Sequence, residues 1–351
     1  MGVNAQRIRD LIESLAEINA TPGKGVSRFS YTDEDRRARK IITDKCESIG
    51  LTAGVDAIGN IRVKYAGLND NLSPVWIGSH IDSVKNGGRF DGICGVVSAL
   101  EVLLTLHDEN TMLPRSVELV IFAEEEGSNF GTTMLGSKAM TGKCDEDYLH
   151  RLRNETGEDA YTVIKRFGFD PSNLESCRIG NNDIYAMVEL QIEQGRILDE
   201  ENLKIGVVEA IAGMHTYKIS VSGASDHAGA TPMDMRRDPM AAAAKIITAL
   251  EDFANQDPDG TAVATVGSIS CLPGMSNVIA SSVVFSVDIR DVKESGIDDI
   301  VKKMRSRCSE VESSDNVSID IELVGKSSCI VLSQKVADII ESSVMESTLP
   351  Y

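Results

Sequence analysis

Histidine and acidic side chains gather in three motifs of the chain. His80 and Asp82 stand two residues apart in GSHIDS (78–83), so on a strand they share one face. Asp91 is the residue before the last glycine of NGGRFDG (86–92). Three consecutive acids occur in FAEEEG (122–127), after a mostly apolar segment. Adjacent carboxylates repel one another unless a cation compensates them or water surrounds them. An imidazole with several carboxylates therefore predicts a centre of two divalent ions, with a further acid that activates water.

Each motif also has a purely structural interpretation. Asp82 could cap a turn beside a partly buried His80, and Asp91 could cap the helix that follows it. The acids at 124–126 could form a turn in water. The metal hypothesis is favoured because the motifs fall together at strand ends of one expected sheet, where open α/β sheets bind their ligands.

The elements that must position these residues alternate between helices and strands. Apolar residues at helical spacing predict helices at 6–18 and 92–106, and a further helix follows the acidic segment 32–35. This alternation predicts an α/β sheet with helices on its faces. Apolar runs predict the strands of this sheet, at 61–65, 75–79, 116–123, 185–190 and 205–210.

The second half of the chain has a different order of elements. It reads β-α-β-β-α-β, the order of a ferredoxin-like unit, so we expect an α+β domain at 212–325. A helix at 336–345 and a strand-like end at 349–351 look like a return to the first sheet, so the first domain is expected to comprise 1–211 and 326–351. The elements of the second domain are strands at 216–222, 261–270, 283–290 and 317–324, and helices at 238–255 and 296–312.

Length, net charge and the apolar pattern exclude several classes of function. A chain of 351 residues exceeds what one hydrophobic core usually serves, which predicts two domains. The net charge of −19 would repel a nucleic acid. No apolar run approaches the ~20 residues of a membrane span, and the first residues lack a secretory signal, so we expect a cytoplasmic protein without a membrane partner. Seven scattered cysteines without a C-x-x-C pair indicate free thiols.

Eight motifs, in the same order and spacing, resemble one enzyme family. From residue 8 to its last residue the chain is similar to the amidase branch of the dinuclear zinc aminoacylase/carboxypeptidase superfamily. That branch contains N-carbamoyl-L-amino-acid hydrolases, β-ureidopropionases and allantoate amidohydrolases. The motifs are GSHIDSVKNGGRFDG, FAEEEGSNFG, GSKAM, VELQIEQG, IGVVEAIAG, DHAGATPMDMRRDP, SNVI and VDIRD.

The resemblance implies a role for each matching position in the metal centre. His80 would bind one metal ion, Asp91 would bridge both ions, and Glu126 would bind the other. Glu125 would be the general base on the bridging water, and Asp82 would orient His80. The two ions would be zinc, with manganese or cobalt as alternatives.

The resemblance also implies the wider architecture. The first domain would be a zinc-peptidase-like mixed sheet with helices on both faces, and the second an inserted ferredoxin-like domain that forms a homodimer. Asn277 and Arg290 would hold the carboxylate of the substrate, Arg290 through a bidentate fork. His227 would stabilise the oxyanion and would reach the site from the neighbouring subunit.

Three features depart from the family pattern. Gln191 replaces a metal-binding histidine and would offer only a neutral amide oxygen, a weaker ligand for zinc. Met214 and His215 stand where a Gln-Arg pair usually contacts the substrate, which makes His215 a candidate substrate contact. Relatives continue for several tens of residues that supply a last histidine ligand, so the C-terminal part of the catalytic domain is expected to be missing.

These observations favour one function and leave others open. The chain is expected to be a metal-dependent amidohydrolase that converts an N-carbamoyl-L-amino acid to the amino acid, carbon dioxide and ammonia. Allantoate is the alternative substrate. A dipeptidase or aminoacylase is disfavoured by Asn277 and Arg290. A truncated or decayed relative with impaired metal binding is the non-enzymatic alternative.

Overall fold

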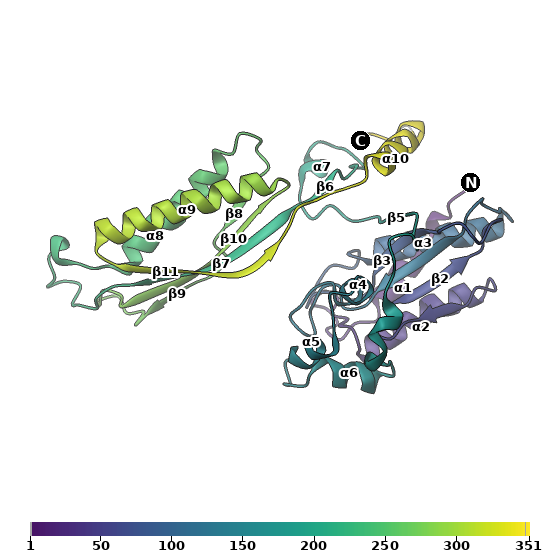
Figure 1. The fold of residues 1–351 in the computed structure, drawn as a ribbon, viewed down its shortest axis with the longest axis horizontal. Helices are drawn as coiled ribbons and strands as arrows, with labels where there is room; N and C mark the ends of the chain where they lie inside the picture. Colours follow the sequence, from purple (N-terminus) through teal and green to yellow (C-terminus); the bar gives the residue numbers. More distant parts are fainter. Residues whose placement is uncertain (1, 348) are drawn as a thin grey trace. The chain divides into compact units, whose positions relative to one another are not determined.

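The computed structural model describes residues 2–347 and 349–351, in two compact units that meet in sequence between Arg196 and Ile197 (Figure 1). The first unit contains a five-stranded mixed sheet in the order β1-β2-β4-β3-β5. β4 runs antiparallel to β2 and parallel to β3, and β3 runs parallel to β5. The strands are β1 (Ala53–Val55), β2 (Ile61–Tyr65), β3 (Val75–His80), β4 (Val117–Phe122) and β5 (Ala186–Val188).

Helices cover both faces of this sheet. On one face, α1 to α3 pack on side chains such as Leu119 and Ile121 of β4. On the other face, Trp76 and Val120 pack with Met140 of α4. This arrangement confirms the mixed α/β sheet with helices on both faces that was expected for the first domain. The helices are α1 (Ala5–Ala16), α2 (Asp33–Glu47), α3 (Ile93–Asp108), α4 (Leu135–Met140), α5 (Glu146–Arg151), α6 (Ala160–Phe167) and the 3-10 helix η1 (Pro171–Cys177).

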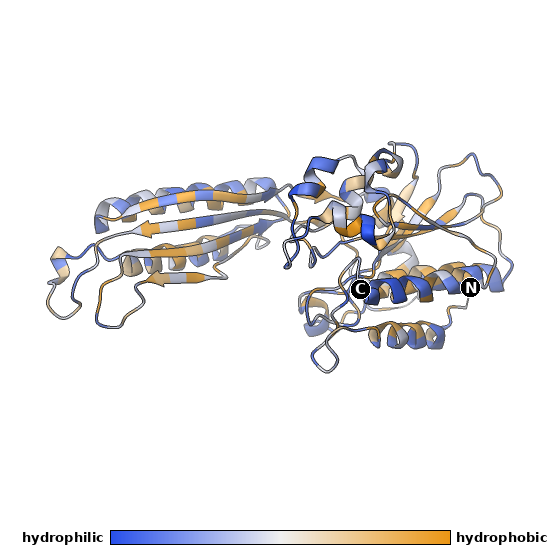
Figure 2. Cartoon of the chain, turned by 90° about the horizontal axis from the view of Figure 1, so that it is seen from below, coloured by the Kyte–Doolittle hydropathy of each residue, from blue (hydrophilic) through white to orange (hydrophobic). Residues whose placement is uncertain are grey.

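Local sequence explains where these elements begin. The Thr32 hydroxyl caps α2 by accepting the backbone N–H of Asp35, and three acidic residues fill the first turn of that helix. β4 lies between β2 and β3, so every residue from Val117 to Ile121 is buried, and all of them except Glu118, which pairs with Arg62, are apolar. Hydrophobic residues lie on one side of the amphipathic helices (Figure 2).

The second unit is built around an antiparallel sheet in the order β11-β7-β10-β8, with β9 also paired to β10. Helices α8 and α9 pack on one face over a core that includes Ile219, Phe285 and Met304. The expected β-α-β-β-α-β order is present except that the first of the two middle strands is divided into β8 and β9. The elements are β7 (Gly213–Ser222), α8 (Pro239–Asn255), β8 (Val263–Thr265), β9 (Ile269–Leu272), β10 (Ser282–Asp291), α9 (Glu294–Asp315) and β11 (Ser318–Ser327).

Three expected strands differ from the structure. The single strand expected at 261–270 is divided into β8 and β9, because the segment around Gly267 leaves the ladder and Ser268 donates to the Ser286 hydroxyl instead. The strand expected at 205–210 is wrong: only Ala210–Ile211 (β6) is a strand, paired with Ile330–Val331 (β12). An apolar run forms a strand only where a neighbour supplies hydrogen bonds. The end at 349–351 is not a strand either.

The remaining elements of the second unit are short segments and one terminal helix. They are α7 (Ile197–Glu200), the 3-10 helix η2 (Met233–Met235) and α10 (Gln334–Ser347). Residues 197–211 and 326–351 belong to this compact unit, although the sequence suggested that 1–211 and 326–351 form the catalytic domain and 212–325 the inserted one. That functional division stays a prediction.

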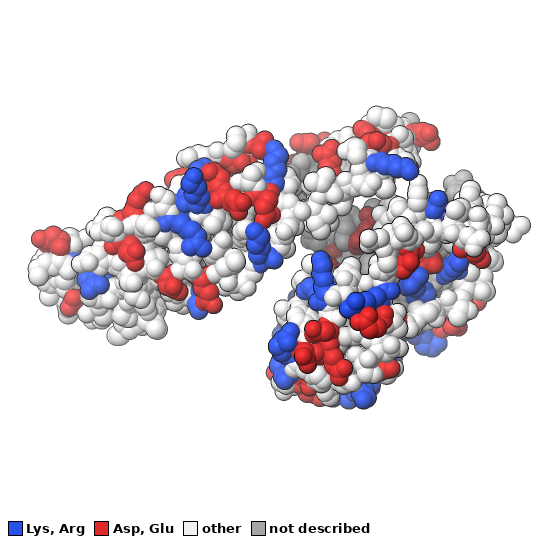
Figure 3. All heavy atoms as spheres, in the orientation of Figure 1, with Lys and Arg blue, Asp and Glu red and all other residues white. Residues whose placement is uncertain are grey.

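Three further properties concern membrane-spanning helices, cysteines and surface charge. Within residues 2–347 and 349–351, no helix has both the length and the apolar character needed to cross a bilayer. All seven cysteines are free thiols, as expected. Acidic and basic side chains are interspersed on the face of each unit shown in Figure 3.

Candidate metal centre

His80 is the last residue of β3, and its side chain is almost completely buried. Its ring nitrogen Nδ1 lies 3.0 Å from the backbone carbonyl oxygen of Asp82, which can only accept, so Nδ1 carries the proton. The other ring nitrogen, Nε2, lies 3.6 Å from a carboxylate oxygen of Glu125. In the neutral ring the contact with the Asp82 carbonyl places the proton on Nδ1 and leaves Nε2 available as a ligand.

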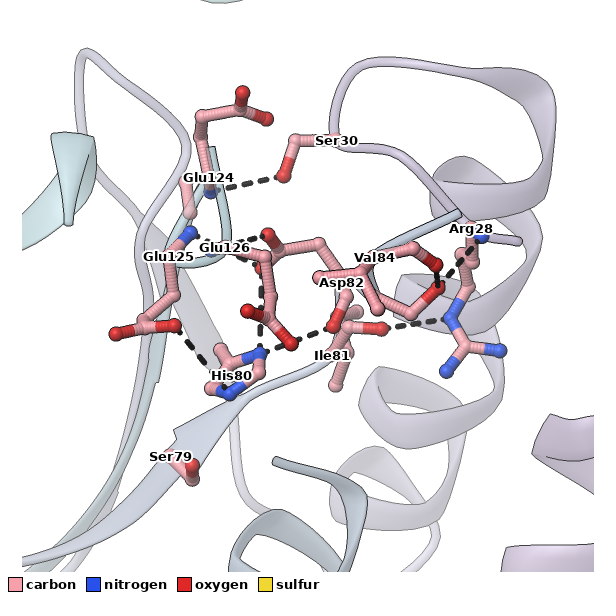
Figure 4. Close-up of polar contacts among 12 residues, drawn as sticks. Arg28, Ser30, Ser79, His80, Ile81, Asp82, Val84, Glu124, Glu125 and Glu126 are labelled. Carbon is pink, nitrogen blue, oxygen red and sulfur yellow. Dashed lines mark hydrogen bonds and ion pairs between the residues drawn. The ribbon is translucent and has the colours of Figure 1, made fainter. Parts of the chain in front are cut away.

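Asp82 connects the ends of the two central strands (Figure 4). Its carboxylate accepts the backbone N–H of Glu125 at 3.2 Å and that of Glu126 at 3.0 Å, and it also lies 3.6 Å from Nδ1 of His80. Asp82 is 1% exposed. The side chain thus fixes the acidic turn after β4 against the segment after β3, which goes beyond the orienting role expected from the sequence.

The three acids after β4 point in different directions. Glu124 is fully buried and has a left-handed backbone, with φ of 50°. Its Oε1 accepts the backbone N–H groups of Asn129 and Phe130, at 2.9 and 3.0 Å, and its own N–H donates to the Ser30 hydroxyl. Glu124 is therefore part of the support of the turn, while Glu125 and Glu126 are partly exposed and remain available for chemistry.

Burial and mutual repulsion shift the ionisation of this cluster. Burial raises the pKa of Glu125 to about 7, partly opposed by His80 and reinforced by the charges of Asp82, Glu126 and Glu189. Burial likewise raises the pKa of Glu126. Burial lowers the pKa of His80, but the hydrogen bond with Asp82 and the surrounding negative charges outweigh it and raise that pKa to about 9. The cluster is thus an environment that a cation would stabilise.

Asp91 and Gly92 form the start of α3. Gly92 has φ of 64°, and a Cβ atom at this position would lie 2.5 Å from both the backbone oxygen and the ring Cε1 of His80. Only glycine permits this close approach. The Asp91 carboxylate accepts the side-chain N–H of Gln194 at 2.7 Å.

We expect Gly92→Ala to disturb the site and the fold together. The new methyl group clashes with His80, and the left-handed backbone adds strain, so the free energy of unfolding should fall by about 1–3 kcal/mol and metal affinity should fall with it. Denaturant unfolding and metal titration measure the two effects. Gly88→Ala is the matched control because a Cβ there meets no atom within 4 Å. Equal stability and metal affinity in the two variants would contradict the account.

His80, Asp91 and Glu126 converge in space. One ligating atom from each lies within 4.8 Å of the other two. An imidazole and carboxylates are ligands of zinc and related divalent ions, and bonds of about 2 Å bring such atoms around one ion or a closely spaced pair. The donor set and the excess negative charge therefore fit a divalent metal.

Gln191 follows β5, which pairs with the strand that carries His80, but its side chain contacts Glu189 and not the cluster. Its side-chain amide donates to Oε1 of Glu189 at 2.9 Å, and the same oxygen accepts the Ser79 hydroxyl at 2.5 Å. Because the amide nitrogen makes this contact, the amide oxygen of Gln191 remains the atom that could approach a metal. Its role as a ligand stays a prediction.

The candidate substrate residues lie in the second unit. The His227 and Asn277 segments are neighbours, because the Ala228 N–H donates to the Asn277 carbonyl and His227 forms an isolated bridge with Val278. Arg290, on β10, makes a two-pronged contact with Asp288, at 2.7 and 3.2 Å. Both His227 and Asn277 are exposed.

His215 differs from these residues because it is buried. It is 4% exposed, and neither ring nitrogen has a hydrogen-bond partner among the residues that the structure describes. Its Nε2 lies 3.4 Å from a carboxylate oxygen of Glu294. Its predicted contact with substrate is not tested by this geometry and stays a prediction.

Sequence reasoning assigned no role to Glu124, Glu189 or Gln194. Glu124 supports the acidic turn, Glu189 links Ser79 to Gln191, and Gln194 contacts Asp91. Glu189 and Gln194 belong to VELQIEQG, one of the motifs that resemble the enzyme family, so their position in the sequence already pointed to the site. No sequence signal distinguished Glu124, because three consecutive acids do not show which side chain points into the protein interior.

Comparisons with known proteins agree with this geometry. The profile of peptidase family M20/M25/M40 matches residues 76–345. The chain is 36% identical, over 99% of its length and 84% of the relative, to an N-carbamoyl-L-amino acid amidohydrolase of Geobacillus stearothermophilus. It is 37% identical, over 81% of its length and 68% of the relative, to an allantoate amidohydrolase of Bacillus subtilis.

A solved structure supports the same family assignment. A hydantoinase/carbamoylase family amidase from Burkholderia multivorans superposes with a TM-score of 0.92 at 30% identity, over 99% of this chain and 84% of that one. The family match, the relatives and the fold together show that this chain belongs to peptidase family M20/M25/M40, in the amidase branch that contains the N-carbamoyl-L-amino-acid and allantoate amidohydrolases.

Proposed function

We propose that this chain is a metal-dependent amidohydrolase that cleaves the carbamoyl C–N bond of an N-carbamoyl-L-amino acid. The observation that carries the proposal is the convergence of His80, Asp91 and Glu126 with Glu125 beside them. The names of the relatives support the substrate class.

His80, Asp91 and Glu126 would hold two divalent ions, zinc in the first instance, with manganese or cobalt as alternatives. Asp91 would serve both ions because a carboxylate offers two oxygens, and Gln191 would add its amide oxygen at the His80 side. Bound divalent ions supply Lewis acidity, which lowers the pKa of water and polarises a carbonyl oxygen.

The protein residues would divide the remaining work. Glu125 would take a proton from the attacking water and deliver it to the leaving nitrogen, because its carboxylate lies beside the metal-binding candidates, 3.6 Å from Nε2 of His80. Asp82 would keep the acidic turn and the His80 ring in place.

The second unit would recognise the substrate. Arg290 and Asn277 would bind its carboxylate, His215 would make a further contact, and His227 would stabilise the oxyanion from the neighbouring subunit of a homodimer. The contact of Arg290 with Asp288 uses two of its five N–H donors, so others remain for a substrate. The homodimer and a cytoplasmic location stay predictions.

Ammonia release tests the proposal and separates the two candidate substrates. The protein is loaded in turn with zinc, manganese or cobalt and assayed with N-carbamoyl-L-amino acids, their D-enantiomers and allantoate. Turnover of the L-enantiomers is the expected result. Turnover of allantoate alone would instead assign the second candidate, which the similarity to the Bacillus subtilis enzyme supports.

Gln191→His is expected to tighten metal binding. An imidazole is a better zinc ligand than a neutral amide oxygen, so affinity at the His80 side should rise by at least tenfold. Competition with a chromophoric chelator measures this. Gln256→His, at an exposed helix end, is the control. Unchanged affinity in Gln191→His would show that Gln191 does not occupy a ligand position.

A further inference from the structure

Arg28 is a charged residue in the interior of the first unit. It is 2% exposed, and its guanidinium makes three hydrogen bonds, all to backbone carbonyls. Nε donates to Ile81 at 2.7 Å, and Nη1 donates to Leu15 at 2.7 Å and Ile18 at 3.1 Å. Within the described part of the chain, no carboxylate lies within ion-pair distance of Arg28, so it is not half of a buried salt bridge.

The backbone of Arg28 holds the same segment as its side chain. Its N–H donates to the Ser83 hydroxyl at 3.0 Å, and its carbonyl accepts the Ser83 N–H at 3.0 Å. Arg28 therefore binds the residues on both sides of Asp82. Its guanidinium binds Ile81 (Figure 4), and its main chain binds Ser83.

Asp82 carries this restraint into the candidate metal centre. Its carbonyl oxygen fixes the His80 ring, and its carboxylate holds the backbone N–H groups of Glu125 and Glu126. A continuous set of hydrogen bonds thus runs from the end of α1 through Arg28 and the 81–83 segment to the acidic turn after β4. A shift of this segment would move a ligand and the general base together.

We propose that Arg28 is a positioning residue for the metal centre. It locks the Ile81–Ser83 segment so that Asp82 presents His80 and the acidic turn in the geometry that binds metal. The consequence for turnover rests on the proposed function, whereas the consequence for metal affinity does not.

The residue type supports a specific role. Burying a charge is costly unless hydrogen bonds compensate it, so a buried arginine without a carboxylate partner depends on its three hydrogen bonds to the backbone. The planar guanidinium can donate in two directions at once, toward the α1 carbonyls and toward Ile81, which a lysine ammonium at the same place cannot match. The carbonyls at the end of α1 also carry the negative end of the helix dipole. Burial lowers the pKa of Arg28 to about 10, opposed by the charges of Asp35 and Asp82, so the group remains a cation at neutral pH.

Two variants of the full chain test the proposal against a merely structural role. Arg28→Lys keeps the charge but not the two-directional hydrogen bonding, and Arg28→Met keeps the volume only. We expect zinc and manganese affinity, measured by chelator competition, to fall about 10- to 100-fold in both. In turnover assays kcat should fall while KM changes little.

Two controls separate positioning from stability. Ile42→Ala destabilises the same core by removing apolar contacts away from Arg28, so it should lower the Tm without changing the metal affinity of the folded protein. Arg62→Lys alters a partly exposed arginine that pairs with Glu118 and should change neither quantity. Wild-type metal affinity in folded Arg28→Lys would overturn the proposal, even if its Tm is lower.

If neither variant folds, hydrogen exchange of the wild-type chain tests the proposal. Metal binding should slow exchange at the Arg28 and Ser83 amides, and unchanged exchange there would overturn the proposal. A wild type that binds metal but releases no ammonia from any substrate would refute the proposed function alone, because the affinity comparison still decides the role of Arg28.

Discussion

Glu125→Gln should lower kcat for N-carbamoyl-L-amino acids by a factor of about 10²–10⁴ and leave the bound metal in place. The amide has nearly the same shape as the carboxylate but cannot accept the proton of the attacking water. The backbone N–H of residue 125, which Asp82 accepts, is unchanged by the substitution. The acidic turn should therefore keep its conformation.

Ammonia release and metal analysis of the same preparation measure the two parts of this result. Glu155→Gln, in an exposed turn of the first unit, is the matched control and should behave as the wild type. A Glu125→Gln enzyme with kcat within threefold of the wild type would remove Glu125 from the role of general base.

Asp91→Ala should abolish binding of both metal ions. The Asp91 carboxylate is grouped with the ligating atoms of His80 and Glu126, and it is the member expected to serve both ions. Its loss removes a negative charge and two oxygen donors from a small donor set, so no partial site of comparable affinity should remain.

Calorimetric titration with zinc, together with metal analysis after dialysis, tests this expectation. Asp44→Ala removes an exposed helix carboxylate that pairs with Lys40 and serves as the control. Retention of two ions per chain in Asp91→Ala would contradict the bridging role, and retention of one ion would assign Asp91 to a single metal.

The convergence of the metal-binding candidates could be anticipated from the sequence. β3 and β4 are mostly apolar strands, and parallel neighbours bring their carboxyl ends to the same edge of the sheet. His80 at one end and Glu126 just beyond the other therefore had to lie close together. The structure adds that Gly92, just before α3, lies so close to His80 that a Cβ atom would not fit.

Other parts of the site depend on contacts that no local pattern encodes. The inward direction of Glu124 follows from its left-handed backbone and from two N–H donors five and six residues further along the chain. Arg28 belongs to a residue type that is mostly exposed, so its burial against the 81–83 segment could not be expected. The strand expected at 205–210 shows the converse case. The local apolar pattern is clear, but only Ala210 and Ile211 have a partner strand, so the rest of the segment does not form a strand.

One measurement tests the central claim most directly: ammonia release from an N-carbamoyl-L-amino acid by the wild-type chain, before and after removal of metal by a chelator. The account predicts release that disappears when the metal is removed and returns when zinc, manganese or cobalt is added. Undiminished release from the stripped protein would contradict it, and so would a metal-loaded protein that releases no ammonia from N-carbamoyl-L-amino acids or from allantoate.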